Sequence, residues 1–128
     1  MYRILIADDH QTIRQILKGM LLDEFPQVYI EEAADSSALI DLAFAKDWNL
    51  IISDLVMPGG GGLFAMEKIK QQKPDVPVLI ISTHPSDQYE KLVIAAGAEE
   101  FISKSNLSER LVPSIKRILD SAGQTQRL

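Results

Sequence analysis

Short apolar runs alternate with helix-like patterns along the whole of this 128-residue chain. Five runs are continuously apolar, which is typical of strands that are buried on both faces of a parallel sheet. Between and after them, apolar residues recur three and four positions apart, as on a helix with one buried stripe. The strands are predicted at residues 3–7, 28–30, 50–53, 78–81 and 100–103. The helices are predicted at residues 11–25, 36–46, 63–72, 88–96 and 108–121.

Five β-α units of this kind predict an α/β domain in which helices cover both faces of one parallel sheet. The length fits one domain, assigned to residues 1–121, followed by a polar tail at residues 122–128 that could begin a linker. The four glycines after Pro58 predict a loop, and Gly123 is predicted to end the last helix. Pro113 lies inside that helical pattern, where proline removes a backbone hydrogen bond, so a late helix start or a kink is expected.

Composition and charge exclude several classes of protein. The apolar share of 46% and the charged share of 24% are those of an ordinary soluble globular domain. The absence of cysteine excludes disulfides and thiolate metal sites. No apolar run is long enough to span a bilayer or to form a signal peptide, so no membrane association and a cytoplasmic location are expected. The net charge of −5 argues against nucleic-acid binding by this segment itself, because phosphate binding needs a basic face.

Chemically unusual residues follow four of the five predicted strands. They are Asp8 and Asp9 after the first strand, Asp54 after the third, Ser82 and Thr83 after the fourth, and Ser103 and Lys104 after the fifth. Because open parallel sheets bind ligands beyond the carboxyl ends of their strands, these residues are expected to converge around one crevice. Each alone has an ordinary explanation as a cap, a turn residue or a surface charge, and their joint placement favours a functional site.

Three carboxylates in one small site need a retained proton or a bound cation. Oxygen ligands without a His or Cys partner point to Mg²⁺. The metal would bridge a carboxylate and a phosphoryl oxygen, while Lys104 and the Ser82 hydroxyl suit two further phosphoryl oxygens. Asp54 is then predicted to be the nucleophile that attacks phosphorus and forms an aspartyl phosphate.

Residues 2–121 resemble the receiver domain of two-component response regulators. The resemblance rests on four pieces whose order and spacing together are highly specific. They are Ile-Leu-Ile-Ala-Asp8-Asp9-His, Ile-Ile-Ser-Asp54-Leu-Val-Met57-Pro58, Pro-Val-Leu-Ile-Ile-Ser82, and Gly97-Ala98 before Phe101-Ile-Ser-Lys104. The resemblance implies a flavodoxin-like doubly wound (βα)5 sandwich with the strand order 2-1-3-4-5. It also implies a signalling module that receives its phosphoryl group from a sensor histidine kinase.

The resemblance assigns roles in phosphorylation to single positions. It makes Asp54 the phosphoacceptor and Lys104 the phosphate-contacting lysine. Asp9 would be the direct metal ligand, and Asp8 would act mainly through a metal-bound water. The backbone carbonyl of Val56 would be the remaining protein ligand to Mg²⁺.

The resemblance also implies a conformational switch. Ser82 matches the hydroxyl that moves toward the phosphoryl group, and Phe101 matches the aromatic side chain that turns inward when that hydroxyl moves. An aromatic residue on a short strand is equally well explained by plain core packing. The output surface would be the face formed by the fourth helix, fifth strand and fifth helix, and phosphorylation is expected to promote homodimerisation.

Three positions depart from the family's usual pattern. Lys104 is followed by Ser105 rather than proline, which resembles receivers joined to LuxR-type helix-turn-helix domains, so DNA would be bound only by a domain outside this chain. Residues 59–62 are all glycine, which leaves the order of this loop and its partner contacts open. Thr83 replaces a smaller residue, and its methyl group is expected to crowd the path of the switch residues.

The two histidines receive lesser roles. His10 is expected to be a solvent-facing start of the first helix rather than a metal ligand. His84 is expected near the mouth of the site, where it and Val56 would tune access to the phosphoryl group and its lifetime.

Other functions stay open beside the regulatory domain of a transcriptional regulator. A stand-alone receiver that docks to proteins is the first alternative. An aspartyl-phosphate phosphatase of the haloacid dehalogenase kind is weaker, because Val56 stands where such enzymes place a second acid. At most slow self-phosphorylation from small donors and slow self-dephosphorylation are expected. A flavodoxin-like cofactor binder is disfavoured, because Asp8 and Asp9 would repel the cofactor's phosphate.

Overall fold

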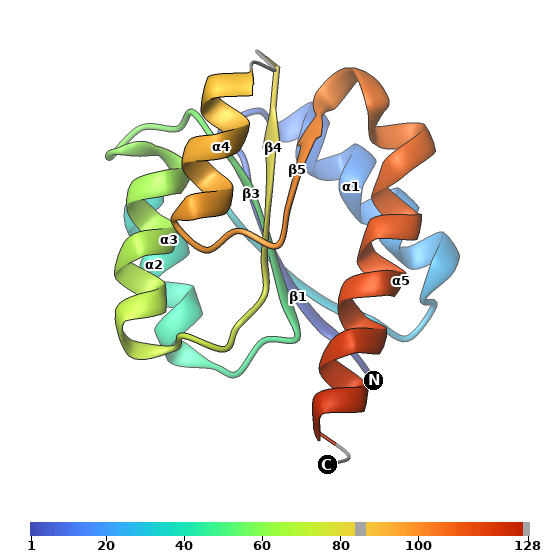
Figure 1. Cartoon of the computed structure of the whole chain (residues 1–128). Coiled ribbons are helices and arrows are strands. Elements are labelled where there is room, and N and C mark those ends of the chain that lie inside the picture. Colours follow the sequence, from blue (N-terminus) through green and yellow to red (C-terminus); the bar gives the residue numbers. More distant parts are fainter. Residues whose placement is uncertain (84–86, 127–128) are drawn as a thin grey trace.

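The computed structural model describes residues 1–83 and 87–126, and the side chains of these residues up to 122. Within this part of the chain, five parallel strands form one sheet in the order β2-β1-β3-β4-β5, which confirms the predicted doubly wound sandwich (Figure 1). The strands are β1 (Arg3–Ala7), β2 (Tyr29–Ala33), β3 (Leu50–Asp54), β4 (Val78–Ser82) and β5 (Glu100–Ser103). The helices are α1 (Gln11–Glu24), α2 (Ser36–Ala45), α3 (Gly61–Gln72), α4 (Asp87–Ala95) and α5 (Leu107–Gln126), with a 3₁₀ turn at Lys104–Asn106.

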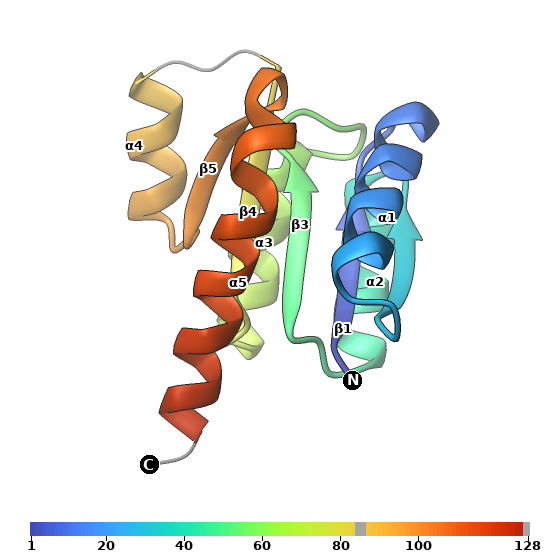
Figure 2. The ribbon, with the colours of Figure 1, turned by 90° about the vertical axis from the view of Figure 1, so that its right-hand side faces the viewer.

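The helices cover both faces of the sheet, α1 and α5 on one side and α2, α3 and α4 on the other (Figure 1, Figure 2). Successive residues of a strand point to opposite faces, so each strand contributes to two cores. In β1, Ile4 and Ile6 belong to the core that also contains Leu17 of α1 and Ile115 of α5. Leu5 lies between them in sequence and belongs to the core under α2, α3 and α4. This two-sided burial explains why β1, β3 and β4 are almost continuously apolar in sequence, whereas the edge strand β2 carries two glutamates.

Helix α3 begins at Gly61, two residues earlier than predicted, so the glycine run is not all loop. Gly59, Gly60 and Gly61 adopt φ angles of 91°, 117° and 86°, in the left-handed region that glycine enters without strain. At Gly62, an added Cβ would lie 2.1 Å from the carbonyl oxygen of Asp54. The helix therefore starts this close to the end of β3 only because these positions carry no side chain.

Helix α5 begins at Leu107 and continues through Pro113, so the expected late start is wrong. Proline inside a helix costs about 3 kcal/mol relative to alanine, but a buried stripe that includes Leu111 and Ile115 packs this helix onto the sheet. Gly123 does not end the helix, since glycine is tolerated inside a helix at a cost of about 1 kcal/mol. The first part of the predicted polar tail is consequently helical. Among the described residues, no helix combines the length and apolar character needed to cross a bilayer.

Candidate functional site

Two acids and a lysine meet at the carboxyl ends of β1, β3 and β5. Asp8 follows β1, Asp54 is the last residue of β3, and Lys104 follows β5. Lys104 Nζ lies 2.9 Å from Asp8 Oδ2 and 3.1 Å from Asp54 Oδ2. All three charged side chains are buried, with 0% of Asp8, 5% of Asp54 and 7% of Lys104 exposed. The convergence predicted from the strand ends is therefore present for these three residues.

The buried cluster carries more negative than positive charge, since two carboxylates face one ammonium group. Asp8 Oδ2 is within ion-pair distance of Lys104. Among the described residues, however, no donor meets this oxygen with hydrogen-bond geometry. A buried carboxylate oxygen without a hydrogen bond is costly, because it has lost its water and gained no full replacement. The cluster is thus suited to one further positive charge.

Burial and neighbouring charges shift the proton equilibria of this cluster. Burial raises the pKa of Asp54, the negative charge of Asp8 raises it further, and the bonds from Lys104 and the Val56 N–H only partly oppose this. Burial lowers the pKa of Lys104, but its close contacts with the Asp8 and Asp54 carboxylates and their negative charges outweigh that effect and leave this pKa raised. Lys104 therefore stays charged at neutral pH, as a permanent cation beside the two acids.

Asp9 and His10 extend the cluster toward solvent. His10 precedes α1 and its side chain is 64% exposed, which agrees with the predicted solvent-facing helix start. Its Nδ1 nevertheless lies 3.1 Å from Asp8 Oδ1 and 3.2 Å from Asp9 Oδ1. One potential ligand atom from each of Asp8, Asp9, His10 and Asp54 lies within 4.8 Å of the others. The structure thus brings the predicted metal ligand Asp9 to the site, together with a histidine that the sequence analysis placed outside the ligand set.

The loop after β3 is held in place by a buried serine that the sequence analysis missed. The Val56 N–H donates to Asp54 Oδ1 at 3.4 Å, while the Val56 side chain is exposed. Ser36, at the start of α2, donates its N–H to the carbonyl oxygen of Pro58 (3.0 Å) and its hydroxyl to that of Gly61 (2.9 Å). These two bonds from the start of α2 fix the loop that follows Asp54.

The predicted switch residues lie on the two strands next to this cluster. Ser82 ends β4, is buried, and pairs in register with Ser103 of β5. Its neighbour Ile81 is in register with Asp54, so Ser82 lies one position beyond that level of the sheet. Thr83 follows the strand and is exposed. His84 lies outside the described residues, so its predicted place at the site mouth remains a prediction.

Phe101 is buried in the core on the α4 side of the sheet. It also lines a pocket of about 210 Å³ with Ser105 and Arg110, between α4 and the start of α5. The inward position agrees with both predicted interpretations, a switch aromatic and plain core packing.

The unusual Ser105 stabilises the turn that carries Lys104. Its backbone N–H donates to Ser103 Oγ at 3.3 Å, and the two hydroxyl oxygens lie 2.8 Å apart. Proline at position 105 could not donate this backbone hydrogen bond. Serine here thus supports the 3₁₀ turn from which Lys104 reaches the acids.

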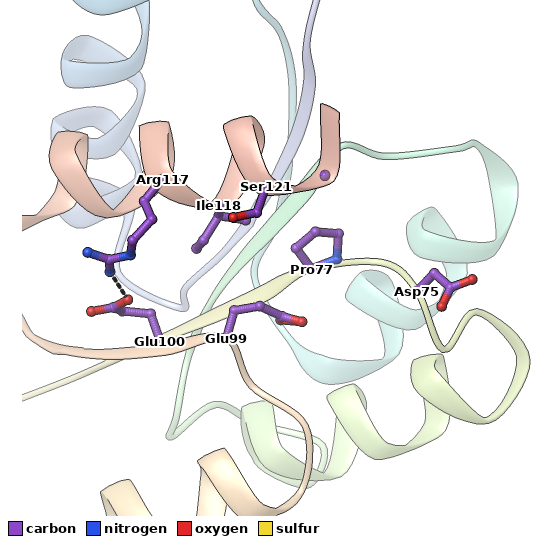
Figure 3. Close-up of a pocket in the computed structure, with 8 residues that line it drawn as sticks. Asp75, Pro77, Glu99, Glu100, Arg117, Ile118 and Ser121 are labelled. Atoms are coloured by element: carbon purple, nitrogen blue, oxygen red, sulfur yellow. Dashed lines mark hydrogen bonds and ion pairs between the residues drawn. The ribbon is translucent and has the colours of Figure 1, made fainter. Parts of the chain in front are cut away.

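A larger hollow lies at the opposite edge of the sheet, near the amino ends of β4 and β5. This pocket has a volume of about 650 Å³ and is closed on one side by α5 (Figure 3). Figure 3 shows Arg117 of α5 directed at Glu100, with which it forms an ion pair. None of the predicted site residues lines this pocket. The buried charge cluster and the larger hollow are therefore at different ends of the sheet.

Comparisons with known sequences identify relatives of the chain. The family described as the response regulator receiver domain matches residues 4–116. The glycerol metabolism activator of Pseudomonas putida is 36% identical over 121 residues, which cover 94% of this chain and 55% of that protein. The response regulator GacA of Pseudomonas aeruginosa is 28% identical over 124 residues, which cover 97% of this chain and 57% of that protein. The chain spans about half the length of these curated relatives.

Solved structures share the fold. A CheY-like response regulator receiver domain protein from Methanospirillum hungatei superposes with a TM-score of 0.89 at 26% identity, covering 98% of both chains. A two-component response regulator of the LuxR family from Aurantimonas superposes with a TM-score of 0.85 at 27% identity, covering 94% of this chain and 86% of that one. The resemblance to LuxR-type regulators, first indicated by Lys104-Ser105, is thus confirmed at the level of the family.

Proposed function

Because the chain belongs to the family of response regulator receiver domains of two-component signalling, we propose that it accepts a phosphoryl group on Asp54. The observation that carries this proposal is the buried contact of Lys104 with both Asp8 and Asp54 at the carboxyl ends of the strands. Buried ionisable groups with shifted pKa values cluster at functional sites, which supports Asp54 as the reacting group.

In the proposed reaction, an Asp54 carboxylate oxygen attacks the phosphorus of a phosphohistidine presented by a sensor histidine kinase. The O–P bond forms as the P–N bond breaks, and the imidazole nitrogen of the kinase leaves with the electron pair. Asp54 must be ionised to attack, and Lys104 favours that form against the effect of burial. Lys104 also supplies positive charge beside the transferred group.

The residues present fit a divalent cation, because an acidic cluster surrounds the buried Asp8 oxygen that has no hydrogen bond. Asp9, Asp54 and the backbone carbonyl of Val56 would hold Mg²⁺, and Asp8 would act through a water. When bound, Mg²⁺ would neutralise the charge that gathers on the phosphoryl oxygens. The excess of acids over Lys104 in this cluster supports this part of the proposal.

The output of the proposed reaction is a changed binding surface. Ser82 and Phe101 would transmit phosphorylation to the face formed by α4, β5 and α5, to which Phe101 belongs and which Ser82 adjoins. The names of the relatives, an activator and response regulators, support a role as the regulatory part of a cytoplasmic transcription regulator that binds DNA through another domain. Homodimerisation on phosphorylation belongs to this proposal, and protein docking by a stand-alone receiver is its alternative.

Intact mass after incubation with acetyl phosphate tests the proposal. Wild type, Asp54→Asn and Asp41→Asn are compared with and without Mg²⁺, and Asp41 serves as the matched control because it is an exposed acid on α2. We expect wild type and Asp41→Asn to gain one phosphoryl group only with Mg²⁺, and Asp54→Asn to gain none. An equal gain in Asp54→Asn would place the acceptor elsewhere. No gain in wild type would contradict the proposed function.

A further inference from the structure

His10 occupies the space between the two consecutive acids at the mouth of the site. Its backbone N–H donates to Asp8 Oδ1 at 2.8 Å, which fixes residue 10 against the buried carboxylate. Its ring nitrogen Nδ1 lies 3.1 Å from the same oxygen and 3.2 Å from Asp9 Oδ1. The imidazole therefore turns a nitrogen toward the acids, although most of the side chain is exposed and the ring could face water instead.

The spacing of these atoms suits a single ion. Two ligands on opposite sides of a divalent ion lie up to about 4.4 Å apart, twice a metal–ligand distance of about 2.2 Å. One ligand atom from each of Asp8, Asp9, His10 and Asp54 already lies within 4.8 Å of the others. Small side-chain rotations would therefore bring His10 Nδ1 and the neighbouring carboxylate oxygens around one centre.

A second observation points to a cation at this place. Asp8 Oδ2 is fully buried, and among the described residues no donor meets it with hydrogen-bond geometry. Lys104 forms an ion pair with this oxygen and also with Asp54, so one positive charge faces two carboxylates and the cluster keeps an excess of negative charge. The carboxylates thus attract a cation, and His10 offers a nitrogen ligand beside their oxygen ligands.

The added donor changes which metals the site prefers. Carboxylate and carbonyl oxygens suit Mg²⁺ and Mn²⁺, whereas imidazole nitrogen suits later first-row transition metals such as Ni²⁺ and Zn²⁺. We propose that His10 Nδ1 is a metal ligand, and that it makes this site a binding site for divalent transition metals as well as for Mg²⁺. This inference rests on the proposed metal site at Asp9 and Asp54.

The test detects the nitrogen directly in bound Mn²⁺, by the ¹⁴N modulation of its electron spin echo. Wild type, His10→Asn and His84→Asn are compared as untagged protein, so that no tag histidine contributes. His84 is the matched control, because it is the second of only two histidines in the chain. We expect imidazole ¹⁴N modulation in wild type and His84→Asn, and its loss in His10→Asn. Modulation that survives in His10→Asn, or that is lost in His84→Asn instead, would overturn the proposal.

Calorimetric titration separates failure of this inference from failure of the proposed metal site. We expect His10→Asn to weaken Ni²⁺ binding on the order of tenfold or more, at least the loss seen when a metal's supporting partners are removed. Its Mg²⁺ affinity should be unchanged, which would also show that the variant is folded. Binding of both ions with no change in His10→Asn would overturn the role of His10 alone. Binding of neither ion to wild type would overturn the metal site itself.

Discussion

The two ends of β5 carry two charge clusters that differ in burial and in consequence. At its amino end, Glu100 pairs with Arg110 and Arg117, and 61% of the Arg117 side chain is exposed. Just past its carboxyl end, Lys104 pairs with Asp8 and Asp54, and all three side chains are almost fully buried. Both arginines of the first cluster reach solvent, although Glu100 is only 15% exposed, whereas the second cluster confines all three of its charges in a poorly solvated site. Burial, rather than the number of ion pairs, therefore distinguishes the candidate functional site from the other end of the sheet.

Removing one charge from each cluster should give the largest difference, measured as the loss in the free energy of unfolding. Lys104→Met leaves two buried carboxylates without their cation, which should lower the free energy of unfolding by about 3–5 kcal/mol. Arg117→Met at the other cluster removes a side chain that is 61% exposed and should change it by at most about 1 kcal/mol. Urea denaturation without divalent ions measures both. Equal losses in the two variants would contradict the contrast between the clusters.

The same lysine should matter for phosphoryl transfer. Lys104→Met should slow phosphorylation by acetyl phosphate on the order of 100-fold, the effect of removing one preorganised charge from a reacting site. Arg117→Met removes a cation from the other end of β5 and should leave the rate unchanged. The time course of intact mass gives both rates, under conditions where circular dichroism shows each variant to be folded. A normal rate in Lys104→Met would remove the lysine from the chemistry.

Two glycine substitutions compare the closely packed end of β3 with an open position on α1. Gly62→Ala places a methyl group 2.1 Å from the Asp54 carbonyl oxygen and should cost about 1–3 kcal/mol of stability, as overpacking does. Gly19→Ala, inside α1 where the added carbon meets nothing within 4 Å apart from the local helix backbone, should stabilise the protein by up to about 1 kcal/mol. Thermal unfolding compares the two. A neutral Gly62→Ala would mean that the end of β3 tolerates displacement.

The smallest predicted effect is a pH-dependent stabilisation by Asp54→Asn. The folded protein raises the pKa of Asp54, chiefly by burial, so its ionised form is disfavoured relative to the unfolded chain. This penalty is absent below the unfolded pKa and is complete above the raised folded pKa. Asp54→Asn should therefore be more stable than wild type at neutral pH, and this advantage should shrink as the pH falls through the raised pKa. Urea denaturation at a series of pH values checks the sign, and a growing advantage at low pH would contradict it.

The strand ends were predictable because their chemistry is local in the sequence. Asp8, Asp54 and Lys104 each follow a short apolar run, and the topology of a parallel sheet brings such ends to one edge. Two expectations for α5 were wrong, a late start caused by Pro113 and an end at Gly123. Packing of Leu111 and Ile115 on the sheet outweighs the cost of the proline at the helix start. Propensity is a weaker influence than a buried face.

The rest of the site depends on contacts between distant residues. Ser36 reaches Gly61 across 25 positions, and nothing in its sequence neighbourhood distinguishes it from a residue near a helix cap. His10 was predicted to face solvent, and it does, but its ring orientation toward Asp8 and Asp9 follows from the turn that begins α1. The start of α3 at Gly61 depends on the close approach of the glycines to the Asp54 carbonyl, a contact that the glycine run alone does not reveal.

Chemical mapping identifies the phosphorylated residue itself. Borohydride reduces an aspartyl phosphate to homoserine, so the acceptor is identified by tandem mass spectrometry of the digested protein after treatment with acetyl phosphate and Mg²⁺. We expect homoserine at position 54, and unchanged aspartate at positions 8 and 9. Homoserine at another position, or none in protein that has gained a phosphoryl group, would contradict the assignment of Asp54 as the acceptor.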